Sequence, residues 1–141
     1  DFLILDLPPG TGDIQLTIVQ TAELDGVVVV TTPQEVALID ARKAIGLFER
    51  VETPILGIIE NMSYFQCPSD GKIYHIFGEG GGEREAAKLG VPLLGKIPLD
   101  ISTRFGGDEG RPVALEDPGQ NPVSAAFRQV AEQCARVVLD R

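Results

Sequence analysis

The chain opens with the stretch Asp1-Phe-Leu-Ile-Leu-Asp-Leu-Pro-Pro-Gly-Thr-Gly-Asp13. Four apolar residues, Phe2 to Leu5, lead into Asp6, and prolines and glycines follow before a helix-like segment. A short apolar run bounded by turn residues predicts a strand buried on both faces. Asp6 is then expected at the carboxyl end of this strand, the edge at which ligands bind in open α/β sheets.

The residues after the predicted strand have the chemistry of a phosphate and metal site. A carboxylate such as Asp6 suits Mg²⁺, which takes one or two carboxylates beside phosphate oxygens. Gly10 and Gly12 allow backbone N–H groups to approach an anion closely. The same residues also fit an ordinary strand-to-helix turn with a capping aspartate, so both interpretations stay open on this stretch alone.

The composition limits the classes of function. The chain has 141 residues, 43% of them hydrophobic, and a net charge of −9. This balance is typical of a globular domain, and it disfavours general binding to nucleic acid or to anionic lipid, which require basic surfaces. Two widely separated cysteines make no disulfide framework, so a cytoplasmic location is the expectation. No apolar run has the length of a membrane span.

Strand and helix signals alternate along the chain, which predicts an α/β fold with a mostly parallel sheet flanked by helices. Besides residues 2–5, strands are predicted at residues 27–30, 55–59 and 93–97. The run Val27–Val30 is all valine, so it is expected to be fully buried.

Helix signals separate these strands. The first helix is predicted over residues 14–22, capped by Thr11 or Asp13. A second begins at Thr32-Pro33-Gln34-Glu35, where the threonine and glutamate have capping-box spacing. Its apolar face consists of Leu38, Ala41, Ile45 and Phe48.

The second half of the chain is expected to continue in the same way. A third helix covers residues 83–89 and ends at Gly90. A short helix and loop occupy residues 100–110, and Asn121 caps a last helix with Pro122 in its first turn.

Several motifs, taken together, carry a family resemblance. They are Asp6-Leu-Pro-Pro-Gly-Thr-Gly-Asp13, Thr31-Thr-Pro-Gln-Glu35, Glu60-Asn-Met-Ser-Tyr-Phe65, Ile76-Phe-Gly78 with Gly80-Gly-Gly82, and Gly95-Lys-Ile-Pro-Leu-Asp100. In order and spacing they resemble the C-terminal part of an Mrp/ApbC-type iron–sulfur cluster carrier, of the MinD/ParA class of P-loop ATPases. The resemblance extends over essentially the whole chain.

The resemblance implies a role for each matching position in an ATP and Mg²⁺ site. Asp6 would be the switch II (Walker B) aspartate that holds a Mg²⁺-bound water, and Pro9 and Gly10 would sense the γ-phosphate, so that Asp6 and Gly10 serve catalysis. Asn61 would bind the adenine, with Pro98 packing near the base. An amide offers both a donor and an acceptor to a base edge, although asparagine is also common in turns that follow a strand.

The chain departs from the family pattern in two places. The Gly-rich loop with a lysine that cradles phosphates is not found in residues 1–141. The resemblance therefore implies that these residues are the C-terminal part of a single P-loop ATPase domain, which runs from the switch II strand to the last helix. The family often carries Cys-x-x-Cys after the Asn-Met-Ser segment, whereas this chain has Cys67 and Asp70 at those positions.

The expected function follows from these matches and departures. The resemblance implies an ATP-binding iron–sulfur cluster carrier with slow ATPase activity, in which Cys67 thiolates of a homodimer share a bridging cluster. Its partners would be iron–sulfur scaffolds or recipient apo-proteins. The alternative is a metal-free MinD/ParA-like ATPase switch that positions a protein partner, with Cys67 as a lone thiol.

Overall fold

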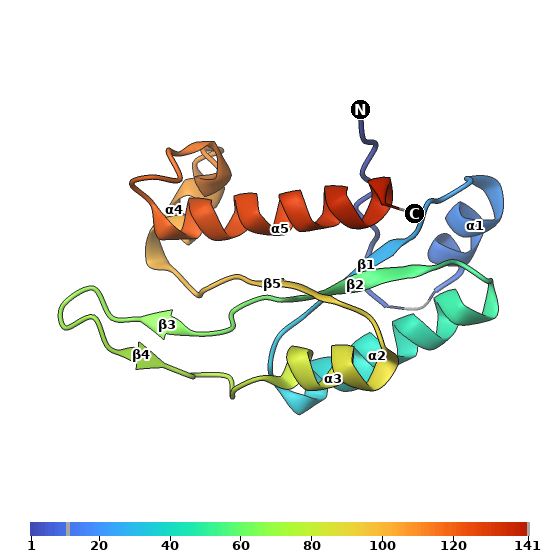
Figure 1. Cartoon of the computed structure of the whole chain (residues 1–141), viewed down its shortest axis with the longest axis horizontal. Helices are drawn as coiled ribbons and strands as arrows, with labels where there is room; N and C mark the ends of the chain where they lie inside the picture. The colour runs from blue at the N-terminus through green and yellow to red at the C-terminus, as the bar shows by residue number, and fades with distance from the viewer. Residues whose placement is uncertain (11, 141) are drawn as a thin grey trace.

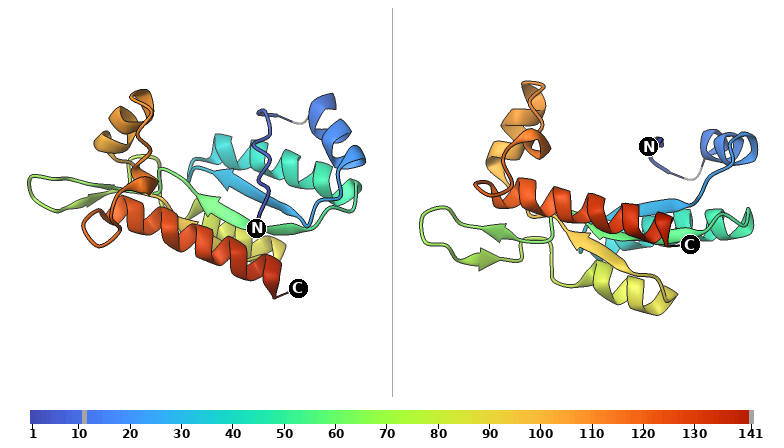
Figure 2. Two further views of the ribbon diagram at one scale, coloured as in Figure 1. Left: turned by 90° about the horizontal axis from the view of Figure 1, so that it is seen from above. Right: turned by 45° about the horizontal axis from the view of Figure 1, so that its top comes forward.

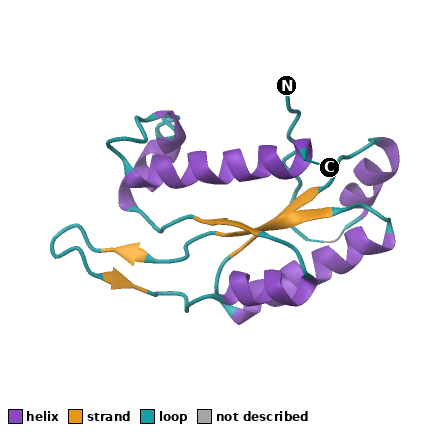
Figure 3. Cartoon of the chain, in the orientation of Figure 1, coloured by secondary structure: helices purple, strands orange, loops and turns teal. Residues whose placement is uncertain are grey.

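The computed structural model describes residues 1–10 and 12–140. Its centre is a parallel sheet of three strands, β1 (Val27–Thr31), β2 (Ile55–Glu60) and β5 (Leu93–Lys96), in the order β1-β2-β5 (Figures 1 and 3). Helix α2 (Glu35–Arg50) connects β1 to β2, and α3 (Gly81–Leu89) precedes β5. The predicted α/β class and parallel sheet are confirmed.

Helices cover both faces of this sheet. In Figure 1, α2 and α3 lie below the strands, and α5 (Pro122–Leu139) lies above them. On the sheet, helix α5 packs against β5 and β2. The core lies between the sheet and α2 with α3, and it contains Val29, Ala41, Ile45, Ile58 and Ala86. All four residues predicted for the inner face of α2 are buried.

The predicted strand at Phe2–Leu5 is wrong. These residues form no strand, and Leu3 and Ile4 are each 87% exposed. A strand needs a hydrogen-bonded neighbour, and β1 pairs with β2 alone among the described residues. The apolar run is therefore an extended segment that has no neighbouring strand to pair with among the described residues.

The valine strand is also less buried than predicted. Strand β1 alternates between buried and more exposed residues, and Val30 is 59% exposed. The face with Val27 and Val29 packs against α2, whereas the face with Val30 gains less cover because α5 lies over β5 and β2.

The first two helices begin differently from the prediction. Helix α1 (Asp13–Thr21) has Gly12 as its N-cap and no side-chain cap, so Asp13 is the first helical residue; Thr11 lies outside the described residues. Helix α2 begins two residues later than Pro33, with Gln34 as N-cap, so the capping box does not form. The tertiary packing decides this start, because Pro33 lies against the first turn of α3.

The C-terminal elements follow the prediction closely. Gly90 ends α3 in a left-handed conformation, with φ +67°. Helix α4 (Ile101–Asp108) and the short 3-10 helix η1 (Val113–Leu115) precede α5. The Asn121 side chain caps α5 by accepting hydrogen bonds from the N–H groups of Val123 and Ser124.

A small hairpin extends from the carboxyl edge of the sheet. Strands β3 (Phe65–Gln66) and β4 (Ile73–Tyr74) pair antiparallel and project away from the body in all three views (Figures 1 and 2). Within residues 1–10 and 12–140, no helix has the length and apolar character needed to cross a membrane.

The close contact at Gly81 yields a matched pair of stability predictions. A Cβ at this position would lie 2.4 Å from the backbone oxygen of Pro33, so Gly81→Ala is expected to lower the free energy of unfolding by about 1–3 kcal/mol. A Cβ at Gly46, within α2, meets nothing within 4 Å, so Gly46→Ala is expected to raise it by about 0.5–1 kcal/mol. Urea denaturation of the whole protein checks both, and an unchanged midpoint for Gly81→Ala would contradict this packing.

Candidate functional site

The carboxyl ends of the three strands are tied together by backbone hydrogen bonds. Asn61 N–H donates to Thr31 O at 2.7 Å, and Ile97 N–H donates to Glu60 O at 2.9 Å. Ser63 N–H then donates to Ile97 O at 3.0 Å. These bonds place the segments that follow β1, β2 and β5 at one edge of the sheet, where α/β folds bind ligands.

Asn61 and Pro98 are the predicted site residues that this edge brings together. Both are half-buried, and each directly follows one of the bonded residues Glu60 and Ile97. The Asn61 side-chain oxygen accepts from Met62 N–H at 2.9 Å, which supports the left-handed conformation of Met62, with φ +52°. Its amide NH₂ has no hydrogen-bond partner among the described residues, so it can donate to a base.

A second polar atom at this edge lacks a partner. Thr32 Oγ1, directly after β1, is buried and makes no hydrogen bond within the described part of the chain. An unpaired buried hydroxyl costs free energy, so a group that bonds to it at this edge is favoured.

The Cys67 thiol lies at the turn of the β3–β4 hairpin. Cys67 Sγ is 3.0 Å from Ser69 Oγ, and this hydrogen bond is the main cause of a thiol pKa below the usual value. The thiolate, which is the form that binds metals, is thereby favoured. Asp70 Oδ1 accepts from Lys72 N–H at 3.0 Å, which lowers the pKa of this carboxyl. Cys67, the expected ligand, and Asp70, at the position of the family's second cysteine, therefore share one turn.

One copy of this turn does not supply a complete set of ligands. No group of three or more His, Cys, Asp or Glu side chains that could hold a metal is found in residues 1–10 and 12–140. Iron–sulfur clusters are usually held by four thiolates, so a cluster at Cys67 needs further ligands.

Asp6, Pro9 and Gly10 lie apart from this edge. All three are exposed, and Figures 1 and 2 show their dark blue segment beside α1, whereas the carboxyl ends of the strands point toward the hairpin. No hydrogen bond or ion pair of the described residues joins them to Asn61 or Pro98. The structure thus brings together the two base-binding candidates and leaves the phosphate candidates in a separate loop.

Sequence reasoning missed the residue that holds this loop. Gln15, on α1, is 3% exposed, and its side-chain NH₂ donates to Pro8 O at 2.6 Å and to Gly10 O at 3.0 Å. Gly10 has φ +94°, a conformation that favours glycine. The sequence signal that pointed to Gln15 is a polar residue on the inner side of a weakly amphipathic helix.

Glu60 was also missed, because its sequence context is that of a strand end. Its side chain is fully buried, with Oε1 accepting from Ser63 Oγ at 2.5 Å and Oε2 from Gly82 N–H at 2.6 Å. A charged group at the end of an apolar strand was the available signal, since buried carboxylates must be paired or hydrogen-bonded.

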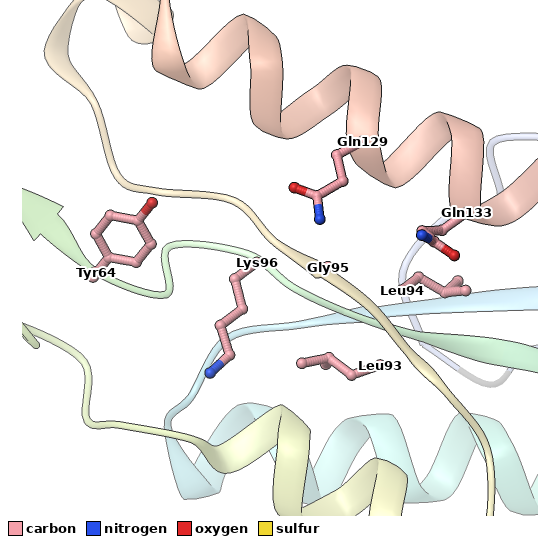
Figure 4. Close-up of a pocket in the computed structure, with 7 residues that line it drawn as sticks. All are labelled: Tyr64, Leu93, Leu94, Gly95, Lys96, Gln129 and Gln133. Carbon is pink, nitrogen blue, oxygen red and sulfur yellow. The ribbon is translucent and has the colours of Figure 1, made fainter.

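A pocket of about 570 Å³ lies along the outer edge of β5 and contains none of the predicted site residues. Figure 4 shows Gln129 and Gln133 of α5 on one side of the strand and the Lys96 side chain on the other. Lys96 Nζ is paired with Glu83 Oε2 at 2.9 Å, so its charge is already compensated.

The chain is similar to proteins of a known family. A family model described as ParA: NUBPL iron-transfer P-loop NTPase matches residues 1–135. A curated relative from Pyrococcus furiosus, named iron-sulfur cluster carrier protein, is 51% identical over 133 residues, which cover 94% of this chain and 44% of the relative. The chain thus spans less than half the length of this relative.

Solved structures show the same fold. A nucleotide-binding protein from Archaeoglobus fulgidus, in complex with ADP, superposes with a TM-score of 0.66 and 44% identity, covering 74% of this chain and 43% of that one. The cell division ATPase MinD from Pyrococcus furiosus gives a TM-score of 0.60 and 26% identity, covering 80% of this chain and 43% of that one. Because the family model covers nearly all of the sequence, the chain belongs to the ParA family of P-loop NTPases, in the group described as NUBPL iron-transfer proteins.

Proposed function

We propose that the whole protein binds Mg-ATP, hydrolyses it slowly, and uses this cycle to carry iron–sulfur clusters to recipient apo-proteins in the cytoplasm. The observation that carries the proposal is the shared edge of the sheet. The base-binding candidates Asn61 and Pro98 and the hairpin with Cys67 all emerge from it. A structural neighbour in complex with ADP supports the nucleotide half of the proposal, and a relative named iron-sulfur cluster carrier protein supports the cargo half.

The nucleotide half rests on the chemistry of the residues present. Asn61 offers an uncommitted NH₂ group, and the unpaired Thr32 Oγ1 marks a place for a polar ligand at the same edge. Asp6 is an exposed carboxylate, the kind of ligand that Mg²⁺ takes, directly or through water, and a bound Mg²⁺ would stabilise negative charge on the phosphates. Gly10, held by Gln15, would present its backbone to the γ-phosphate.

The cargo half rests on the Cys67 turn. Two subunits related by a two-fold axis would supply two Cys67 thiolates, with two Asp70 carboxylates available as harder ligands. A cluster held in this way on an exposed hairpin would be labile, which suits a carrier. The net charge of −9 supports protein partners rather than nucleic acid or an anionic membrane.

A metal-free ATPase switch that positions a protein partner is the second candidate. The observation that favours it is Asp70 at the position of the expected second cysteine. The likeness to the cell division ATPase MinD supports the same alternative.

The base-binding role of Asn61 yields a test of the nucleotide half. Asn61→Ala in the full-length protein is expected to weaken ATP binding by about tenfold, because a hydrogen bond to the base is lost in a partly buried site. Titration calorimetry measures the affinity, with Gln129→Ala, an exposed α5 residue outside the predicted site, as the control. Equal ATP affinities for wild type and Asn61→Ala would contradict the assignment.

A further inference from the structure

The hairpin that carries Cys67 belongs to a single excursion of the chain between β2 and α3. The excursion leaves the sheet at Ser63 and returns at Gly82, in the first turn of α3. Figure 1 shows it as the long green loop that reaches out from the carboxyl edge and comes back beside α3.

Both ends of this excursion are bound to one buried carboxylate. Glu60 Oε1 accepts from Ser63 Oγ at 2.5 Å, where the excursion begins. Glu60 Oε2 accepts from Gly82 N–H at 2.6 Å, where it ends. The side chain of Glu60 is fully buried, so neither donor can be replaced by bulk water.

The packing around Glu60 leaves little freedom for these two contacts. A Cβ at Gly82 would lie 3.1 Å from Cβ and 3.1 Å from Oε2 of Glu60, so the absence of a side chain permits the close approach of α3. The N-terminus of a helix favours a negative charge, which matches the position of the carboxylate. If either end of the excursion moved away from Glu60, the buried carboxylate would lose a hydrogen bond, which costs free energy.

The backbone of Glu60 belongs to the edge that carries the base-binding candidates. Asn61 follows it directly, and Glu60 O accepts from Ile97 N–H, the residue before Pro98. The base of the hairpin is joined to the same edge a second time, because Leu99 N–H donates to Tyr64 O at 2.8 Å. Asn61 and Pro98 are therefore connected to Glu60 and to the start of the excursion through the chain and these backbone hydrogen bonds.

We infer that Glu60 is a positioning residue that couples nucleotide occupancy at the Asn61 edge to the conformation of the Cys67 hairpin. The inference rests on the proposed ATP site, and it adds the route by which that site controls the thiol. Two sites are coupled when binding of a ligand at one site shifts the conformational equilibrium of the structural element that carries the other site. The effect is reciprocal. In this protein that element is the excursion, and the Glu60 carboxylate connects it to the sheet.

The test measures the reactivity of Cys67 with and without nucleotide in the full-length protein. Alkylation of Cys67 by N-ethylmaleimide is followed by peptide-resolved mass spectrometry, with and without saturating Mg²⁺ and a non-hydrolysable ATP analogue. Cys134, half-buried on α5, is the internal reference thiol. Titration calorimetry on the same samples records binding of the analogue, and thermal unfolding records whether each variant is folded.

The variants separate coupling from simple stability. Ser63→Ala removes the link at the start of the excursion, and Glu60→Ala removes both links. Glu60→Gln keeps both, since its oxygen accepts from Gly82 N–H and its NH₂ donates to Ser63 Oγ. Ser124→Ala is the matched control, because Ser124 is another buried serine and its hydroxyl donates to Glu116 O at 2.7 Å, away from the excursion.

In wild type, Glu60→Gln and Ser124→Ala, the analogue is expected to change the alkylation rate of Cys67 by about fivefold or more, the lower end of usual couplings. In Ser63→Ala the analogue is expected still to bind, but the ratio of the Cys67 alkylation rates with and without it should approach one. A nucleotide effect that persists in folded Ser63→Ala and Glu60→Ala overturns the role of Glu60. Binding without any effect on Cys67 in wild type overturns the coupling and leaves the ATP site standing, whereas absence of binding overturns the proposed function itself.

Discussion

Cys67→Ser is expected to abolish binding of an iron–sulfur cluster to the full-length protein. The turn offers a single thiol, and its hydrogen bond with Ser69 favours the thiolate that would bind iron. A serine hydroxyl is a poor substitute, because iron–sulfur clusters are held by thiolates. After anaerobic reconstitution with iron and sulfide, the visible absorption of the wild type should be absent from Cys67→Ser, and bound iron should fall to background.

The matched variants for this experiment are Asp70→Cys and Cys134→Ser. Asp70→Cys restores the second thiol of the turn, so the cluster should survive longer in air than that of the wild type. Cys134 lies on α5, and its pKa is raised by burial, so Cys134→Ser should leave the absorption unchanged. Solution mass should show that the wild-type chromophore accompanies a dimer. If Asp70→Cys takes up iron and wild type does not, the metal-free ATPase switch becomes the better description.

Asp6→Asn is expected to lower ATP turnover by the full-length protein by about 10²–10³-fold, or about 3–4 kcal/mol, the usual effect of removing one electrostatic contact to the transition state. The substitution keeps the shape of the side chain and removes a negative charge from the surroundings of Mg²⁺. Binding of Mg-ATP should be affected less than hydrolysis, because the charge matters most as the phosphate reacts. Steady-state phosphate release and titration calorimetry measure the two quantities.

A second exposed aspartate provides the control for Asp6. Asp40, on α2, has a side chain that is 78% exposed and pairs with Lys43 at 3.0 Å. Asp40→Asn removes the same charge away from the predicted phosphate loop, so it should leave turnover unchanged. Turnover of Asp6→Asn equal to that of wild type would show that the switch II assignment is wrong.

The two candidate regions of the site differ in how the chain holds them. The Asn61 edge is fixed by backbone bonds among three strands, whereas Pro9 and Gly10 are held in their loop by the side chain of Gln15. The loop expected to meet the phosphates thus depends on one side chain, whereas the Asn61 edge depends on backbone hydrogen bonds.

The sequence alone determined the features that depend on neighbours along the chain. The apolar period of α2 predicted its buried face, and Asn121 with Pro122 predicted the start of α5. Strand–helix alternation predicted the parallel sheet, and the ordered motifs predicted the family. These signals are local, because helix periodicity, caps and turns act over a few residues.

The tertiary structure decided what depends on residues far apart in the sequence. The run Phe2–Leu5 reads as a strand, but a strand forms only where another strand pairs with it, and these residues have no such partner among those described. Thr32 and Pro33 have the sequence of a helix start, but Pro33 packs against Gly81 and the helix begins at Glu35. Glu60 carries only a weak local signal, a charged residue at the end of an apolar strand, because its donor Gly82 reaches it only when the hairpin excursion closes on the sheet.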